Sequence, residues 1–462
     1  MIAPLLLAAA CAALALQDTS RLTLTQALRR ALDHYPTVSA ARAGLDQASA
    51  AAGEASSARL PRLALDASVS RSQEPNIVYP LHGLSLTPGS TSAMPVFDQT
   101  LGQAALGLSW TLWDFGARGG RIRAARATAD AAGASLDAAR AAIAGRVAVA
   151  YLRVLTAQGV LAALDQRLAS LEAEADRVHR LMAVGRAARV EVLRIEAEAL
   201  RARADRVGGR TALDVAEREL AQLAGVSPDE ARAARLEPLR LADTTDIAPR
   251  RAALVERALA ANPDLRQARL AADAGRAGLA AARATRFPEL RLSGSWVDRG
   301  GADHEFRAEW STSVQISYPL FTGGQRASSI RRADADYRAR SEQARLAAMT
   351  AEQAVDRALA ALSESHARVA ALEQAAAQFD EVVRIRRLAL ETGSGTQTDY
   401  LGAETDLLRA RASAIEARHA EIAARVELAR VTGELTPEWL AAAVRAATDP
   451  VAPTQGRTEG PR

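Results

Sequence analysis

The amino-acid sequence predicts a mainly α-helical protein built from one repeat that occurs twice, with two β-strands in each repeat. Three observations predict this class. The chain has two proline-free segments long enough for very long helices, it has four short segments in which apolar and polar residues alternate, and its proline and glycine positions recur in the same order.

The repeat is marked by motifs that return at a fixed spacing. RALDHYP at 30–36 returns as RALAANP at 257–263, and Leu60-Pro61 returns at the same spacing as Phe287-Pro288. LWDFG at 112–116 is echoed by LFTGG at 320–324 at a second spacing, which also relates Gly185 to Gly393. The change of spacing falls in the loop between the first two alternating segments, where insertions are tolerated.

This duplication divides the chain into five parts. They are a signal peptide (1–15), a first repeat (16–225), a linker (226–250), a second repeat (251–435), and a C-terminal short helix with a disordered tail (436–462).

Composition favours long helices packed side by side. Aromatic residues are only 4% of the chain, and alanine, arginine, leucine and glutamate dominate. All 58 basic residues are arginine, the net charge is +4, and the arginines alternate with acids as on a solvated, ion-paired helix face. No basic cluster is interleaved with aromatic residues, so nucleic acid is not an expected partner.

The amino terminus has the features of an export signal. Ile2 to Leu16 is apolar but too short to span a bilayer as a helix, and Ala13-Leu14-Ala15 is a small-x-small cleavage site. It lacks a positively charged start. Cys11, the single cysteine, is either removed with this segment or is a lipidation site, although Ala8-Ala9-Ala10 is a poor lipoprotein context. No later run of 18 apolar residues is evident.

The helices are predicted in order along each repeat. In the first, a helix opens near Thr25, breaks at Tyr35-Pro36 and resumes over 37–59; a very long helix covers 117–184, turns at Gly185 and returns over 190–224. The second repeat has the long helix at 325–392, the turn at Gly393 and the return at 398–432. A proline-free helix from 117 to 184 would be about 100 Å long and needs neighbours along its whole length.

The four strands are predicted at 63–71, 104–112, 290–296 and 310–320, forming β-hairpins at about 62–113 and 289–321. Nothing else in the chain could cover their apolar faces, whereas in a bilayer the apolar face would meet lipid and the polar face a water-filled lumen. The lumen candidates are Asp66, Ser68, Arg291, Ser293 and Gln315. The candidates for an aromatic girdle at the membrane interface are Trp110, Trp113, Trp296, Trp310 and Tyr318, unless these are ordinary core residues of a small sheet.

Four strands cannot close a barrel, and an open sheet edge in lipid is costly. Several copies would therefore share one barrel. Two copies would give eight strands and an interior filled by side chains, whereas three would give twelve strands and room for a channel.

Taken together, the duplicated halves, the Tyr/Asn-Pro helix break, the strand exits at 113–116 and 321–324 and the glycine-turn hairpins resemble the TolC family of outer-membrane efflux proteins over essentially the whole mature chain. The resemblance implies a homotrimer with a twelve-stranded barrel in the outer membrane of a Gram-negative bacterium and a trimeric α-barrel crossing the periplasm. It also implies a periplasmic membrane-fusion adaptor and an inner-membrane pump as partners, with drugs, metal cations or polypeptides as cargo. The alternative is a structural coiled-coil protein of the cell envelope without a channel.

In that family the hairpin tips form the periplasmic mouth and the adaptor contact. The resemblance assigns these roles to Gly185, Arg186, Arg189, Glu191, Gly393, Gly395 and Asp399, with Glu191 and Asp399 as mouth-lining acids. Gly402 stands where family members can carry a second acid. Arg194, together with Arg186 and Arg189, makes the first tip more basic than the family pattern implies. The alternative is that all of these are solvated turn residues.

No enzymatic chemistry is predicted. The six histidines lack ligand spacing and no cysteine pair exists, so neither a metal site nor a cofactor is expected. Asp114-Phe115-Gly116 matches a kinase tripeptide by letters alone, and GSGTQT at 393–398 lacks the P-loop lysine.

Overall fold

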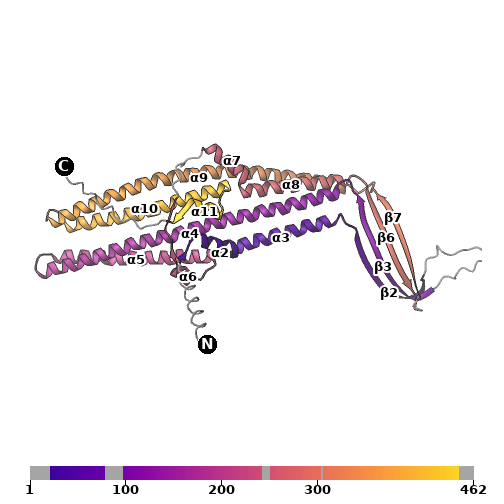
Figure 1. Ribbon diagram of the computed structural model, residues 1–462, viewed down its shortest axis with the longest axis horizontal. Helices are drawn as coiled ribbons and strands as arrows, with labels where there is room; N and C mark the ends of the chain where they lie inside the picture. Colours follow the sequence, from indigo (N-terminus) through magenta and orange to yellow (C-terminus); the bar gives the residue numbers. More distant parts are fainter. Residues whose placement is uncertain (1–20, 79–96, 242–249, 303–304, 447–462) are drawn as a thin grey trace, which may run out of the picture. The chain divides into compact units, whose positions relative to one another are not determined.

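The computed structural model describes residues 21–78, 97–241, 250–302 and 305–446, and its elements occur in the same order twice (Figure 1). The first series is α2 (Leu24–His34), α3 (Pro36–Ser57), β2 (Arg62–Ile77), β3 (Phe97–Trp113), α4 (Ala117–Ala183) and α5 (Arg189–Ala224). The second is α7 (Arg251–Ala261), α8 (Pro263–Ala284), β6 (Glu289–Gly300), β7 (Phe306–Ser317), α9 (Gln325–Glu391) and α10 (Gln397–Thr432). The predicted signal peptide, with Cys11, and the predicted C-terminal tail lie outside the described residues.

The chain forms two compact units, and each contains parts of both repeats. The helical unit comprises residues 1–43, 134–266 and 346–462, and the strand unit comprises 44–133 and 267–345. The repeat division made from the sequence therefore describes the internal duplication, whereas compact packing joins equivalent parts of the two repeats.

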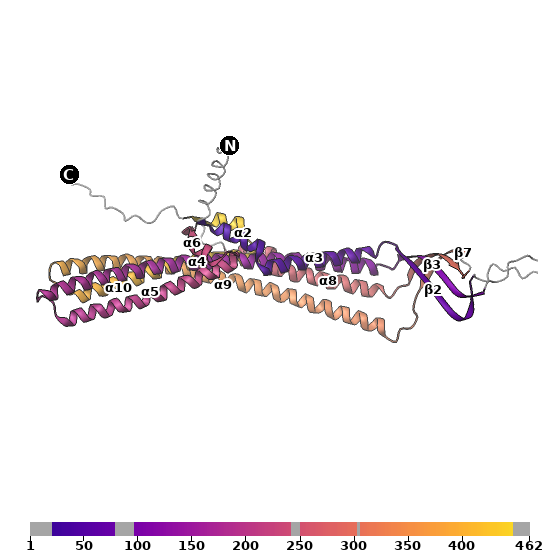
Figure 2. The same cartoon turned by 90° about the horizontal axis from the view of Figure 1, so that it is seen from below.

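In the helical unit, two long hairpins pack through their α4 and α10 members. The α4–α5 and α9–α10 tips lie at the same end in both views (Figure 2). Thr156 of α4 lies 2.6 Å from the Nδ1 atom of His419 on α10, and a Cβ at Gly159 would stand 3.1 Å from Ile415. The helices therefore lie in the order α5, α4, α10, α9, with α5 and α9 at the two flanks.

Arginine–carboxylate pairs join the two helices of each hairpin. Arg203 pairs with Glu172 across α4 and α5 at 2.7 Å, and Arg411 pairs with Asp380 across α9 and α10 at 2.6 Å. Such exposed pairs contribute about 0–1 kcal/mol each, so the buried alanine, leucine and valine stripes hold the hairpins together. The ion-paired faces that composition predicted are present.

Helix α4 also contains a window of mean hydropathy 1.7, apolar enough by composition to span a bilayer. The window is not an uninterrupted apolar run, so the apolar pattern of the sequence did not predict it. Of the window, 39% is buried, and the buried residues include Val147, Tyr151 and Val154. Core helices and membrane spans share this composition, so packing in the hairpin accounts for it.

Two small sheets join the chain ends to the linker. Strand β1 (Arg21–Leu22) pairs in parallel with β4 (Arg235–Leu236), and β5 (Leu239–Leu241) pairs antiparallel with β8 (Val444–Ala446). The short helices α6 (Pro228–Ala233) and α11 (Pro437–Ala443) begin at Ser and Thr N-caps followed by proline. Strands of two or three residues have no readable alternation, and the sequence did not predict these sheets.

The strand unit contains a four-stranded antiparallel sheet in the order β2, β3, β6, β7 (Figure 1). Strand β3 of the first repeat pairs with β6 of the second, so the duplicated hairpins form one sheet. Strands β2 and β7 are its edges, and within the described residues neither has a partner on its outer side.

The strands differ in length from those predicted. Strand β2 runs on to Ile77 and β3 begins at Phe97, where the Pro- and Gly-containing loop obscured the alternation. Strand β7 ends at Ser317, so Tyr318 and Leu320 lie beyond the strand in which the alternation placed them. Pro319 explains the early end, because proline cannot donate to the ladder and restricts the residue before it.

Candidate functional site

The sheet separates apolar and polar side chains onto opposite faces. The cross-strand register joins Leu65, Leu106, Trp296 and Trp310 in one row on the apolar face. This face is not covered: Leu65 and Trp310 are each 74% exposed. A soluble sheet would bury such a row, so the face requires an apolar medium or another molecule.

The polar face is arranged in rows of distinct chemistry. Arg62, Ser109, Ser293 and Ser313 form one row, and Ser293 and Ser313 are joined by a 2.8 Å hydrogen bond. Next comes a row of small residues, in which Ser295 and Ser311 are likewise 2.8 Å apart. All five lumen candidates lie on this face, in four different rows.

Further from the helices, two charged rows follow on the same face. Asp66 and Glu309 stand in one row with Ala105 and Val297 between them. Ser68, Gln103, Arg299 and Arg307 form the next. An acidic row therefore lies directly beside a basic row, a feature that the sequence did not reveal because it depends on register across three strand pairs.

The aromatic candidates lie in two bands on the apolar face and at its end. Trp110 and Trp113 lie beside the helices, and Trp110 donates from Nε1 to the Arg59 carbonyl at 2.9 Å. Trp296 and Trp310 pair with each other six residues further along β6 from Leu290, about 20 Å at roughly 3.3 Å per residue. Tyr318, past the end of β7, stacks under the Arg326 guanidinium, 5.0 Å from its ring centre.

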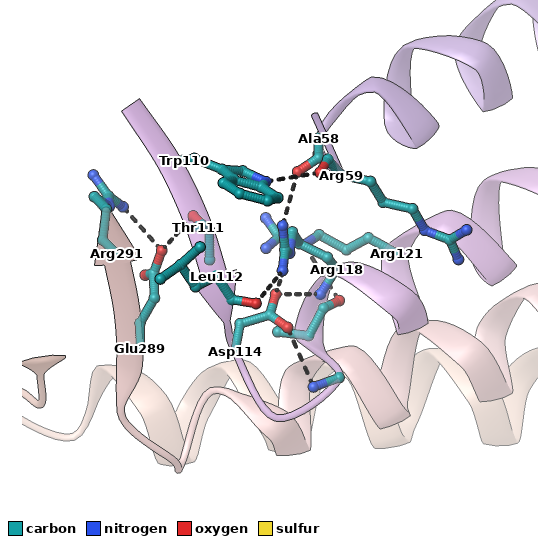
Figure 3. Close-up of polar contacts among 12 residues, drawn as sticks. Ala58, Arg59, Trp110, Thr111, Leu112, Asp114, Arg118, Arg121, Glu289 and Arg291 are labelled. Carbon is teal, nitrogen blue, oxygen red and sulfur yellow. Dashed lines mark hydrogen bonds and ion pairs between the residues drawn. The ribbon is translucent and has the colours of Figure 1, made fainter. Parts of the chain in front are cut away.

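The exit from β3 into α4 is fixed by Asp114 and Arg118 (Figure 3). The Asp114 carboxylate accepts from the backbone nitrogens of Gly116 at 3.2 Å and Arg118 at 2.7 Å, and so caps the start of α4. The Arg118 side chain pairs with Asp114 at 3.2 Å and donates to the carbonyls of Ala58 and Leu112. One arginine thus joins the end of α3, the end of β3 and the start of α4.

Aromatic side chains continue past this exit. Phe115 has a left-handed backbone, with φ of 51°, and its ring stacks on Phe287 at 5.0 Å between ring centres. Trp113 meets Phe115 edge-on at 6.0 Å. These three rings link the apolar face of the sheet to the ends of α4 and α8.

The hairpin tips close on glycine. Gly185 and Gly393 are left-handed, with φ of 71° and 73°, which favours glycine because no Cβ is present. Gly395 is equally constrained, since a Cβ there would stand 3.0 Å from that of Ala389. The sequence-predicted turn residues therefore have conformational reasons to be glycine, whereas Gly402 faces open space.

The two tip acids differ. Thr396 caps α10 by accepting from the Asp399 backbone nitrogen at 3.2 Å, and its hydroxyl donates to the Asp399 carboxylate at 2.7 Å. This hydroxyl, with the Thr396 backbone, holds the pKa of Asp399 below its ordinary value. The N-cap residue of α5 is Ala188, which provides no side-chain cap, and Glu191 has no ion-pair partner among the described residues.

Contacts between the tips were not predicted. Arg177 of α4 donates to the Gln397 side chain at 2.5 Å, and Arg194 of α5 donates to the Thr398 hydroxyl at 3.1 Å. Leu401 packs on the apolar cluster of the first hairpin, which includes Val178 and Val192. Arg186 and Arg189 make no ion pair within the described part of the chain. The sequence did not single out Arg177 as a contact residue, because it lies in a helix face where arginines and glutamates alternate regularly.

The described residues contain no group of three or more histidine, cysteine, aspartate or glutamate side chains placed to hold a metal ion. The features that stand out in the described residues are one apolar face, one layered polar face and two joined tips.

Comparisons with known proteins agree with this architecture. The family described as outer membrane efflux protein matches residues 27–226 and 254–434, one match for each repeat. The alkaline protease secretion protein AprF of Pseudomonas aeruginosa is 28% identical over 202 residues, which cover 41% of this chain and 40% of AprF. The aligned region thus spans about two fifths of that relative.

Solved structures share the fold over most of the chain. The outer membrane protein VceC of Vibrio cholerae matches with a TM-score of 0.74 at 23% identity, covering 89% of this chain and 96% of VceC. The CmeC outer membrane channel of Campylobacter jejuni matches with a TM-score of 0.76 at 17% identity, covering 89% and 85%. The two family matches together span most of the sequence, and the chain belongs to the outer membrane efflux protein family.

Proposed function

We propose that three copies of this chain form an outer-membrane duct that passively carries cargo from a periplasmic adaptor and inner-membrane pump to the exterior. One observation carries the proposal: the four-stranded sheet has an apolar face, a polar face and two edges without partners in the described chain. Unpaired edges are expensive in hydrocarbon, so the sheet must be completed by further copies. Three copies give twelve strands and an interior wide enough for a channel.

The flanks of the helical unit support self-association. Helix α5 exposes Leu193, Leu200 and Val207 at seven-residue intervals, and α9 exposes Ile385 and Leu388. A seven-residue apolar stripe is typical of a helix that packs against another helix. Since α5 and α9 lie at opposite flanks, α5 of one copy would meet α9 of the next, and the ring would close with the same contact at each junction.

The layered polar face would line the lumen. Asp66, Ser68, Arg291, Ser293 and Gln315 would face water, and three copies would place six carboxylates from Asp66 and Glu309 beside six guanidinium groups from Arg299 and Arg307. Rings of one charge govern which ions pass through a pore. The apolar face would meet lipid, with Trp110, Trp113, Trp296, Trp310 and Tyr318 near the two interfaces as an aromatic girdle.

The tips would form the periplasmic mouth and the adaptor contact. Glu191 and Asp399 stand at the starts of α5 and α10, and Arg186 and Arg189 are exposed beside them. The name of AprF points to polypeptide secretion and that of CmeC to an outer membrane channel, so secretion and efflux both fit this duct.

The test compares adjacent residues on opposite faces of β7. Val314→Arg puts a charge on the apolar face, which costs about 2–4 kcal/mol at the bilayer midplane, whereas Gln315→Arg puts the same charge on the polar face. Native chains should fractionate with outer membranes as trimers and conduct in planar bilayers. V314R should lose membrane trimers and Q315R should keep them. If the native chain is a soluble periplasmic monomer, or both variants behave alike, the envelope-scaffold function replaces the duct.

A further inference from the structure

A basic cavity lies between the end of α8 and the first turns of α9. It has a volume of about 560 Å³ and is lined by Arg283, Arg286, Ile330, Arg331, Asp334 and Arg338. Four guanidinium groups therefore share one cavity with one carboxylate. We call these six residues the arginine cavity.

The single carboxylate does not balance the four cations. Asp334 pairs with Arg338 at 3.1 Å and with Arg283 at 3.6 Å. Arg331 donates to the Ser328 hydroxyl at 3.1 Å, which carries no charge, and Arg286 makes no ion pair with any described residue. The hairpins of the helical unit, by contrast, match arginine to acid nearly one to one. The arginine cavity thus has a net charge of +3 and suits an anion with several acceptor oxygens, such as a phosphate.

An apolar cavity adjoins it. Arg283 and Asp334 also line a second cavity of about 480 Å³, whose other walls include Phe115, Leu279, Phe287 and Tyr337. Phe115 and Phe287 are stacked, and Trp113 meets Phe115 edge-on. Because Trp113 lies in the row of Leu290 on the apolar face of the sheet, an apolar path leads from the arginine cavity to that face.

The position matches the boundary of a bilayer. Strands β6 and β7 have 12 residues each, close to the 9–11 that a tilted strand needs to cross the hydrocarbon. The residues just beyond their helix-side ends therefore stand at the height of lipid headgroups, where aromatic rings and arginines are favoured.

We propose that the arginine cavity binds the headgroup phosphate of an anionic phospholipid from the periplasmic leaflet, with its acyl chains lying along Trp113 and the apolar face of the sheet. A free phosphate would use the same arginines but not the aromatic path. This inference rests on the outer-membrane location and not on conduction, so it can fail while the duct stands.

The first repeat supplies an internal comparison. At the spacings that relate the two repeats, Arg59 and Arg123 correspond to Arg286 and Arg331, whereas Ser56 and Asp130 occupy the positions of Arg283 and Arg338. Arg126 stands at the position of Asp334, so the first repeat has three arginines and one acid at these positions, one net positive charge fewer than the arginine cavity. A lipid preference should depend mainly on the second repeat.

The test measures lipid binding to the purified full-length protein in detergent by native mass spectrometry. Dioctanoyl phosphatidylglycerol, dioctanoyl phosphatidylcholine and inorganic phosphate are the probes. The double variant R286Q/R331Q removes two cations while leaving Asp334 paired, and R59Q/R123Q removes the equivalent two from the first repeat.

Native protein and R59Q/R123Q should bind phosphatidylglycerol more tightly than phosphatidylcholine, and R286Q/R331Q should lose that preference by on the order of tenfold. If R286Q/R331Q fails to fold, R286K/R331K replaces it; this variant keeps the charge, loses the bidentate geometry and should bind several-fold more weakly. Equal binding of the two lipids, equal loss in both double variants, or displacement of phosphatidylglycerol by equimolar inorganic phosphate would overturn the proposal.

Discussion

The Arg194 guanidinium donates to the Thr398 hydroxyl at 3.1 Å and so joins the start of α5 to the start of α10. A few residues away, Arg177 donates to Gln397 at 2.5 Å. Both bonds cross between the two hairpins, which otherwise end in separate glycine turns. In the proposed duct these bonds hold the periplasmic mouth in the arrangement seen here.

The first prediction concerns these bonds. The double variant R177A/R194A should raise the open probability of single channels several-fold, because each lost charge-assisted bond contributes about 1.5–3 kcal/mol at most and less where solvent competes. R186A/R189A removes the same charge from the exposed part of the first tip and serves as the control. Planar-bilayer recording of both variants distinguishes release of the tips from a general charge effect, which would affect both equally.

The second prediction concerns the acidic row of the sheet. D66R/E309R should shift ion selectivity towards anions, because six carboxylates per trimer would become six guanidinium groups next to six others. S293A, on the same polar face but uncharged, should leave reversal potentials unchanged. Reversal potentials under a salt gradient measure the shift; unchanged values in D66R/E309R would place the polar face away from the ion path.

The third prediction concerns Tyr151. Its side chain is fully buried, and its hydroxyl accepts from the Glu237 backbone nitrogen at 2.8 Å while lying 3.2 Å from the Leu22 carbonyl. Tyr151→Phe leaves these backbone groups without that partner and should destabilise the fold by about 1–3 kcal/mol. Tyr400→Phe is the matched control, as no hydrogen bond from its hydroxyl is seen in the described structure. Thermal unfolding of both variants checks the difference.

The fourth prediction concerns Glu217, whose side chain is 8% exposed and whose Oε2 atom lies 3.8 Å from Arg232, beyond hydrogen-bond distance. Burial raises the pKa of Glu217 above its ordinary value. Between the unfolded and the raised folded pKa the folded state binds more protons, so this residue's contribution to stability falls as pH rises through that window.

Glu217→Gln removes the titrating group and keeps the shape. It should therefore flatten the fall in melting temperature above about pH 4.5 and stabilise the protein at neutral pH. Glu219→Gln, on the same helix but more exposed, is the comparison. If the melting temperature depends on pH in the same way in native protein and E217Q, burial of the Glu217 carboxylate does not destabilise the folded state.

The fifth prediction concerns Arg118 at the strand-to-helix exit. Arg118→Ala should reduce the yield of membrane trimers, because Asp114 loses its ion pair and the carbonyls of Ala58 and Leu112 lose their donor. Arg121 lies almost one helical turn further along α4 and donates to the Ala117 carbonyl at 3.4 Å, its one hydrogen bond seen among the described residues. R121A should therefore fold normally. Quantitative blotting of unheated membrane samples reports the trimer yield.

Much of the fold could be predicted from the sequence because glycine and proline positions mark the ends of helices and the apolar–polar periodicity of the strands is regular. The helix ends at Ala183 and Glu391 follow directly from Gly185 and Gly393, whose left-handed backbones end a helix wherever they occur. The apolar and polar faces of the strands were also readable, because alternation needs no knowledge of neighbours.

What the sequence could not supply depends on pairing between distant segments. The row of Asp66 and Glu309 exists only through the registers of three strand pairs, and the Arg177–Gln397 bond exists only because α4 packs on α10. The arginine cavity is likewise invisible in the sequence, because arginine is common throughout and only its unmatched charge at one place is informative. Tyr318 lies outside β7 because Pro319 ends the strand, although the alternation of residues continues past it.

The unequal capping of the two return helices has a mechanical consequence. Thr396 anchors the first turn of α10, whereas α5 begins at Arg189 after Ala188, whose side chain offers no comparable anchor. Under the same torque the uncapped end should unwind first, so dilation of the mouth would start at three alternate positions around the ring and reach the other three afterwards.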